Sequence, residues 1–180
     1  FGNSFFKASN FSELVPVART FPSKDTNFLT IDRKTLIGLA DLLELNELPI
    51  MLYIETRPES ISDNIIPLMK RLRIDGVGMG IELASENFRK SSLNRYPAQD
   101  KIINAFKILK KAGIKRTTYN IIGLPDETEE MILETIIFNQ NLEPDNITVA
   151  FYSPYIGTAE QLKSKELKYF DDYEQNIDGQ

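Results

Sequence analysis

The stretch that decides the fold reads QDKIINAFKILKKAG at residues 99–113, and IKRTTYNIIG follows directly at 114–123. In the first part, apolar residues recur on one side of a helix, and Gly113 stands where a left-handed C-cap would end that helix. The second part returns as a strand, Thr117 to Ile122. A helix that leads directly into a buried strand is the repeating unit of an α/β protein.

The same alternation extends to both sides of this stretch. Strands that are separated by helical crossovers must pair in parallel, and a parallel sheet needs both of its faces covered. The sequence therefore predicts an α/β architecture. The other predicted strands run from Ile50 to Ile54, from Gly76 to Glu82 and from Ile147 to Tyr152. Before the second of these, one helix is capped by Asp32 and ended by Pro49, and another is capped by Ser62. Later in the chain, a short helix runs from Ser85 to Ser92, and a longer one opens at Asp126 and has Ile136 and Phe138 on its apolar side.

Composition sets the class of protein. The chain has 180 residues and 42% hydrophobic content, which predicts one globular domain with a core. Its 21 Lys and Arg residues are scattered and give a net charge of −5 with 26 Asp and Glu, so nothing predicts a nucleic-acid partner. No apolar run approaches the roughly 18 residues of a membrane span, and no signal peptide is visible. We expect a soluble, cytoplasmic protein.

The sequence contains neither cysteine nor histidine. The lack of cysteine excludes disulfides, thiol nucleophiles and any metal that cysteine would hold. The lack of histidine removes the commonest metal ligand and the usual general base at neutral pH. These two absences exclude most mechanisms of a stand-alone enzyme.

Three regions are expected along the chain. Residues 1–30 are aromatic and interrupted by proline, and they predict an irregular segment with one short strand, or the remnant of an early part of a barrel. Residues 31–165 hold the α/β pattern. Residues 166–180 form an acidic C-terminal tail, which we expect to be solvated.

Two charged residues stand where ligands bind in α/β proteins, at or just after strand ends. Glu82 closes an otherwise apolar strand, so it must reach solvent or accept hydrogen bonds from a ligand or a basic partner. It could instead cap the following helix or pair with Arg95. Arg95 precedes Tyr96 and Pro97, and its guanidinium suits a carboxylate. An ordinary surface salt bridge is the alternative for Arg95.

Two glycine-containing stretches are candidate ligand sites. Gly123 is followed by Leu124 and Pro125, which lets a backbone approach a flat ligand, although the same residues could merely turn a strand into a helix. The glycines at 76–80 lie within a predicted strand, whereas a dinucleotide-binding fingerprint needs a turn that opens a helix. We therefore reject a dinucleotide site there.

Four phrases occur in fixed order: GMGIE at 78–82, LNR at 93–95, NIIGLPDET at 120–128 and SPYIGT at 153–158. Together they resemble the second half of the barrel of radical S-adenosylmethionine (SAM) enzymes, in the subgroup associated with cobalamin-binding domains. The resemblance implies a partial parallel (β/α) barrel, TIM-like and incomplete, without the first strand and its cluster loop. It also implies the SAM contacts: Glu82 holds polar groups of SAM, Arg95 meets its carboxylate, Asn120, Ile122 and Gly123 line the adenosine pocket, and Pro154 and Tyr155 lie at the adenine edge.

Members of that family hold a 4Fe-4S cluster on a C-x3-C-x2-C loop and use it to cleave SAM into methionine and a 5′-deoxyadenosyl radical. Without cysteine, this chain could supply SAM contacts but not the electron path. We therefore expect a fragment of a radical SAM enzyme, whose parent holds the cluster, any cobalamin and an unknown small-molecule substrate. The alternative is a complete, non-catalytic barrel remnant that serves as a binding or interaction module. The missing first strand would leave an apolar, unpaired sheet edge, which predicts self-association or the ordering of residues 1–30 across that edge.

Overall fold

The computed structural model describes residues 27–46, 50–94 and 97–153, the backbone of 19–20, and the positions 162 and 166. Its strands form one sheet in chain order, and every neighbouring pair runs in parallel. The predicted parallel α/β architecture is confirmed. The strands are β1 (Arg19–Thr20), β2 (Leu52–Glu55), β3 (Ile74–Glu82), β4 (Lys115–Ile122) and β5 (Asn146–Phe151).

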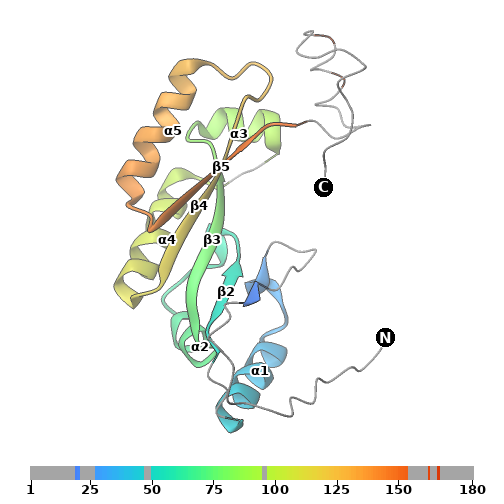
Figure 1. Ribbon diagram of the computed structural model, residues 1–180, viewed down its shortest axis with the longest axis vertical. Coiled ribbons are helices and arrows are strands. Elements are labelled where there is room, and N and C mark those ends of the chain that lie inside the picture. The colour runs from blue at the N-terminus through green and yellow to red at the C-terminus, as the bar shows by residue number, and fades with distance from the viewer. Residues whose placement is uncertain are drawn as a thin grey trace.

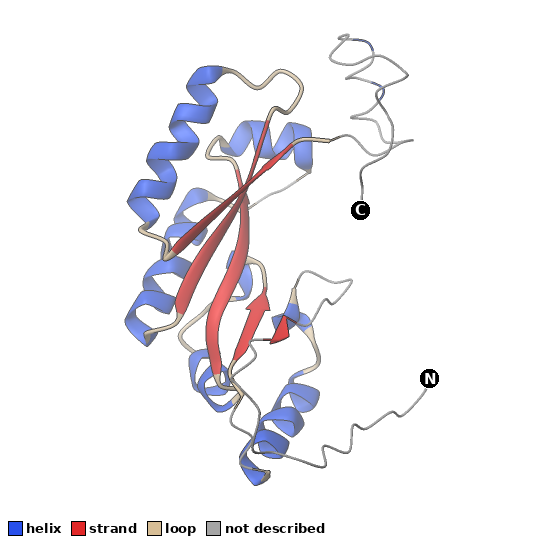
Figure 2. Ribbon diagram, viewed as in Figure 1, coloured by secondary structure: helices blue, strands red, loops and turns tan. Residues whose placement is uncertain are grey.

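Helices connect the strands and cover the sheet. Figure 1 shows α4 and α5 along one side of β3, β4 and β5, α3 at the upper end of these strands, and α1 and α2 near the opposite end of the sheet. In Figure 2 the strands cross one another at an angle, which is the usual twist of a parallel sheet. The helices are α1 (Arg33–Leu45), α2 (Ile66–Arg71), α3 (Glu86–Leu93), α4 (Gln99–Ala112) and α5 (Glu129–Leu142), with short 3-10 turns at η2 (Phe28–Thr30) and η3 (Pro58–Ser60).

Several predicted helix ends are confirmed. The Asp32 carboxylate accepts a hydrogen bond from the backbone N–H of Thr35 at 3.1 Å, as an N-cap does. Gly113 ends α4 in the left-handed region, with φ of 72°. The α4 helix begins and ends at the residues that the sequence predicts, because its apolar periodicity and its C-cap agree.

Two predicted helix starts are wrong. Ser62 does not cap α2; its carbonyl accepts from the Ile65 N–H in a turn, and α2 begins at Ile66, just before a proline that cannot continue a helix upstream. The α5 helix does not open at Asp126, because that residue has a φ of 67°, which is not helical. Thr128 is the N-cap of α5 instead.

Alternation along β3 separates the two faces of the sheet. We call outer the face on which Val77, Met79 and Ile81 lie, all fully buried in the main apolar core. The inner face is the one on which Gly76, Gly78 and Gly80 lie. The outer face packs into one core with the buried side chains of α4, which are Ile102, Ala105, Phe106, Ile108 and Leu109.

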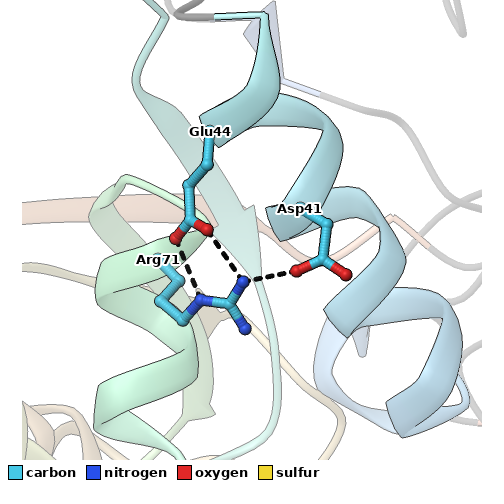
Figure 3. Close-up of polar contacts among 3 residues, drawn as sticks. All are labelled: Asp41, Glu44 and Arg71. Carbon is cyan, nitrogen blue, oxygen red and sulfur yellow. Dashed lines mark hydrogen bonds and ion pairs between the residues drawn. The ribbon is translucent and has the colours of Figure 1, made fainter.

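A surface ion-pair network joins α1 to α2 (Figure 3). One guanidinium nitrogen of Arg71 lies 2.5 Å from Asp41 and 2.9 Å from Glu44, and its Nε donates to the other oxygen of Glu44 at 2.9 Å. All three side chains are exposed by more than a third, so water and salt screen their attraction. The network links two helices near the amino end of β3, away from the carboxyl ends of the strands.

The outer face is apolar but open beside β5. Ile147, Val149 and Phe151 are more than half exposed, and Ile136 on α5 is 58% exposed. The prediction that Ile136 lies on the buried side of α5 is therefore wrong. The reason is topological, since β5 is an edge strand of the described sheet and pairs only with β4.

Candidate functional site

The candidate site is a hollow of about 90 Å³ at the carboxyl ends of β2, β3 and β4, on the inner face. This volume has room for several waters or for one polar end of a larger ligand. Strand ends of this kind are where α/β folds bind ligands, because the loops converge there. We call it the inner hollow, and the residues that line it are Glu55, Thr56, Arg57, Gly78, Gly80, Glu82 and Tyr119.

Glycines leave this face of β3 without side chains over most of its length. A Cβ added at Gly78 would lie 2.6 Å from a ring carbon of Tyr119, and one at Gly76 would lie 2.7 Å from the ring of Tyr53. Real Cβ atoms do not approach ring carbons so closely, so only glycine allows the two rings to lie on the strand backbone. The glycine spacing that does not fit a dinucleotide fingerprint therefore has a packing role within β3.

The two tyrosines meet over the glycines. The Tyr53 and Tyr119 hydroxyl oxygens are 3.5 Å apart, which is long for a hydrogen bond between hydroxyls. Burial raises the pKa of the Tyr119 phenol, and hydrogen bonds with Tyr53 and Glu55, together with the Glu55 charge, raise it further. Tyr119 therefore stays protonated near neutral pH and can donate a hydrogen bond into the hollow.

Glu82 lies at the end of β3 in an uncommon backbone conformation. Its φ is 64°, and the Leu83 N–H donates to the Ile81 carbonyl at 2.8 Å, so Glu82 is the central residue of a γ-turn with positive φ. Such turns are rare and strained for a residue other than glycine. The pairing with β4 also shifts between Gly80 and Glu82, as at a β-bulge. The Glu82 carboxylate turns back over Gly80, and the residue as a whole is 9% exposed.

The loop after β2 is held by one side chain. The amide oxygen of Asn27 accepts hydrogen bonds from the hydroxyls of Thr56 at 2.5 Å and Ser60 at 3.0 Å, and from the Arg57 N–H at 3.4 Å. Asn27 directly precedes η2. It fixes the loop that carries Arg57 at the rim of the inner hollow.

The predicted SAM contacts on β4 do not share the face of Glu82. The Asn120 side chain exchanges hydrogen bonds with Asn139 of α5, the shorter one at 2.8 Å, so it lies on the outer face. With Ile122 it lines a second hollow, of about 220 Å³, which is mainly apolar and which we call the outer hollow. Its other lining residues are Ile132, Thr135, Ile136, Asn139, Ile147 and Val149.

Of the remaining predicted residues, the structure describes Gly123 but not the other three. The Gly123 N–H, with a φ of 84° at Gly123, already donates to the Glu127 carboxylate at 2.5 Å, and the Leu124 N–H donates to the same oxygen at 3.2 Å. A ligand would have to compete with Glu127 for that amide. Arg95, Pro154 and Tyr155 lie outside the described residues, so their roles stay predictions.

Sequence reasoning missed two residues of the inner hollow. Glu55 ends β2 as Glu82 ends β3, so the same argument about a carboxylate at a strand end could have found it. Tyr119 stands next to Asn120 on β4 and hence on the opposite face. Strand alternation separates these neighbours, but the sequence does not say which of them faces α5.

The described residues of this site do not form a metal-binding cluster. Within the part of the chain that the structure describes, no cluster of three or more Asp and Glu residues could hold a metal ion, and the sequence supplies no cysteine or histidine. Within the same ranges, no helix is both long and apolar enough to cross a membrane.

The Radical SAM superfamily model matches residues 24–138, which is well over half of the chain. The chain therefore belongs to the radical SAM superfamily, and the family prediction is confirmed. The prediction of a cobalamin-associated subgroup within this superfamily stays a prediction.

The chain is 28% identical over 128 residues to the anaerobic magnesium-protoporphyrin IX monomethyl ester cyclase of Rubrivivax gelatinosus, and this covers 70% of the chain and 23% of that protein. The chain thus spans about a quarter of the length of the curated relatives it matches. It is similar to part of each relative, and so to one region of a longer protein.

Solved structures agree on the fold. The radical SAM enzyme coproporphyrinogen III oxidase from Escherichia coli aligns with a TM-score of 0.64 and 19% identity, over 76% of this chain and 32% of that one. A radical SAM methyltransferase from Kitasatospora setae aligns with a TM-score of 0.58 and 12% identity, over 66% of this chain and 24% of that one. The partial parallel (β/α) barrel is confirmed; at these identities the likeness shows the fold alone.

Proposed function

We propose that this chain is a fragment of a radical SAM enzyme and that its inner hollow binds the polar part of SAM. The observation that carries the proposal is the convergence of Glu55, Glu82 and Tyr119 from three neighbouring strands. Membership in the superfamily supplies the identity of the ligand. The geometry supplies the residues that would meet it.

Five of the residues that line the inner hollow have roles that their chemistry supports. The Glu82 and Glu55 carboxylates accept hydrogen bonds, which suits the ammonium and hydroxyl groups of SAM. Gly78 and Gly80 make room for the Tyr119 ring and the Glu82 carboxylate, which lie over the backbone of β3. The Tyr119 phenol donates a hydrogen bond.

The inner hollow would hold only part of the ligand. Its volume of about 90 Å³ encloses a portion of a molecule as large as SAM. The predicted contacts at Arg95, Pro154 and Tyr155 would meet the rest.

The residues present do not fit an iron-sulfur cluster. A 4Fe-4S cluster needs thiolate ligands, and the sequence has no cysteine. No redox step is therefore assigned to this chain. We propose that reductive cleavage of SAM to a 5′-deoxyadenosyl radical belongs to a longer parent protein that supplies the cluster. After anaerobic treatment with iron and sulfide, the chain should show no cluster absorption; a brown protein that retains about four irons would contradict this.

Cobalamin is a proposal for the parent protein only. The methyltransferase from Kitasatospora setae was solved with cobalamin and a 4Fe-4S cluster bound. This chain lacks histidine, and we assign no residue of it to cobalamin. Any cobalamin would be held by another domain.

The alternative, a non-catalytic remnant that serves as an interaction module, is not favoured by the superfamily match. The two proposals differ in ligand binding. A fragment with a working SAM site binds SAM through the inner hollow, whereas a remnant with another role has no reason to keep that affinity.

Calorimetric titration with millimolar SAM tests the proposal. Arg95→Ala should weaken binding by about 1.5–3 kcal/mol, because it removes a charge-assisted pair with the SAM carboxylate. Glu82→Gln should weaken it less, because the amide keeps one acceptor. Glu129→Gln, at an exposed position in the first turn of α5, is the control and should change nothing. No measurable binding by the unaltered chain would refute the proposed function.

A further inference from the structure

We infer that Arg89 is a positioning residue for Glu82, because its buried guanidinium holds the turn that presents the Glu82 carboxylate to the inner hollow. Arg89 lies on α3, outside the inner hollow, and no sequence motif singles it out. The consequence for binding rests on the proposed function, but the positioning itself does not.

The guanidinium binds the two residues that directly follow Glu82. One terminal nitrogen of Arg89 donates to the Leu83 carbonyl at 2.5 Å and to the Ala84 carbonyl at 2.9 Å. The other terminal nitrogen donates to the Pro97 carbonyl at 2.8 Å. A single fork therefore ties the turn after β3 to the loop between α3 and α4.

Two further side chains complete the clamp at Ala84. The Ala84 carbonyl also accepts from the Gln99 side chain at 2.9 Å, and its N–H donates to the Thr135 hydroxyl at 2.9 Å. Residues from α3, α4 and α5 thus converge on one residue, Ala84. Arg89 is the only charged group of the three, and hydrogen bonds from a charged donor are the stronger ones.

A clamp is needed because the turn at Glu82 is strained. A γ-turn with positive φ persists in a residue other than glycine only when its surroundings hold it. Arg89 holds it at the cost of burying a charge, since its side chain has no exposed surface and its Nε–H has no partner among the described residues. Burial lowers the pKa of Arg89, while the nearby Glu86 and Glu82 charges oppose that shift, and the group remains a cation.

The charge adds a second effect. Among the described residues, the hydrogen-bond acceptors of the Arg89 guanidinium are three backbone carbonyls, which are neutral groups. Its positive field therefore acts on the strand end, where it attracts the Glu86 and Glu82 charges. Geometry and charge both favour a Glu82 side chain that is fixed in place.

Amide hydrogen exchange in the full chain tests the positioning directly. In Arg89→Met, the N–H groups of Leu83 and Ala84 should exchange at least about tenfold faster than in the unaltered chain, relative to the Met79 N–H in the middle of β3. Lys90→Met removes a charge at an exposed position of the same helix and should leave both rates unchanged. Unchanged rates in Arg89→Met would overturn the inference.

Arg89→Lys serves if the methionine variant does not fold. Lysine keeps the charge but cannot reach the Leu83, Ala84 and Pro97 carbonyls together, so the same two amides should exchange severalfold faster. If a folded Arg89→Lys protein showed the exchange rates of the unaltered chain, the clamp would not depend on the guanidinium fork, and the inference would fail.

A double-mutant cycle tests whether Arg89 acts through Glu82. Arg89→Met should weaken SAM binding by about the same factor as Glu82→Gln, and the double variant should be no weaker than Arg89→Met alone. If the double variant lost SAM affinity by the product of the two single-variant factors, Arg89 would act independently of Glu82, which contradicts the inference. If the unaltered chain binds no SAM, the proposed function fails, while the exchange rates still decide the positioning role.

Discussion

The two faces of β3 differ in the side chains that they carry. On the outer face, Val77, Met79 and Ile81 are fully buried against the helices. On the inner face, Gly76 and Gly78 carry no side chain, and the rings of two tyrosines occupy the space. Alternate residues of one strand therefore carry the core on one side and the floor of the candidate site on the other.

The largest expected effect is on the outer face. Met79→Ala should lower the free energy of unfolding by about 2–5 kcal/mol, because it leaves a cavity in the core. Met51→Ala is the matched control, since Met51 is half exposed and its truncation should cost less than about 0.5 kcal/mol. Chemical denaturation measures both values. Equal losses would show that the outer face is not the core.

A smaller loss is expected on the inner face. Gly78→Ala should lower the free energy of unfolding by about 1–3 kcal/mol, because the new methyl group overlaps the Tyr119 ring. Gly38→Ala is the control: Gly38 lies within α1 with nothing near its missing Cβ, so that change should stabilise the protein by about 0.4–1 kcal/mol.

Removing the Tyr119 ring tests the same contact between Gly78 and Tyr119 a second time. In a Tyr119→Ala background, Gly78→Ala should cost much less, because the overlapping atoms are gone. If Gly78→Ala were tolerated as well as Gly38→Ala in the unaltered chain, the rings would not lie on the strand backbone.

The exposed edge predicts an effect on assembly. The apolar outer side of β5, and its backbone edge that no other described strand pairs with, favour self-association, so we propose that the chain forms dimers or larger species through β5. Val149→Lys should raise the dissociation constant about tenfold, because burying a valine contributes roughly 1.5 kcal/mol or more. Thr148→Lys, on the other face of β5, should matter less. An unaltered chain that sediments as a monomer would contradict the proposal.

The smallest effect is expected at the ion-pair network in Figure 3. The hydrogen bond from Arg71 lowers the pKa of Glu44 below its ordinary value. A lowered pKa contributes stability above the unfolded pKa, and that stability is lost as the pH falls through the folded pKa. Arg71→Gln should therefore destabilise the protein only slightly at neutral pH, less in high salt and not at all in acid. A thermal melting difference that persisted in acid would contradict this assignment.

Local patterns in the sequence were enough to predict much of the fold. The periodicity of α4, its C-cap at Gly113 and the alternation of helices with strands predicted the parallel sheet. Helix starts failed where one residue decided the backbone, as at Asp126 with its positive φ. A sequence pattern does not reveal such a conformation, because any residue other than glycine is expected at negative φ.

The site was harder to predict because it depends on contacts between distant residues. The place of Glu82 at a strand end predicted a ligand contact, and the structure puts this residue in the inner hollow. Asn120 was predicted beside it, but its side chain binds Asn139 of α5 on the other face. Nothing predicted a role for Arg89, because arginine is rarely fully buried. Only tertiary packing could distinguish these cases.

The central claim is that SAM binds the inner face of the sheet and not the outer face. Nuclear magnetic resonance of the ¹⁵N-labelled chain, titrated with SAM, tests it most directly. We predict that the amide signals of Glu55, Gly78, Gly80 and Glu82 shift with SAM, while those of Ile136, Asn139 and Val149 around the outer hollow stay in place. Shifts confined to the outer hollow, or no shifts at millimolar SAM, would contradict the account.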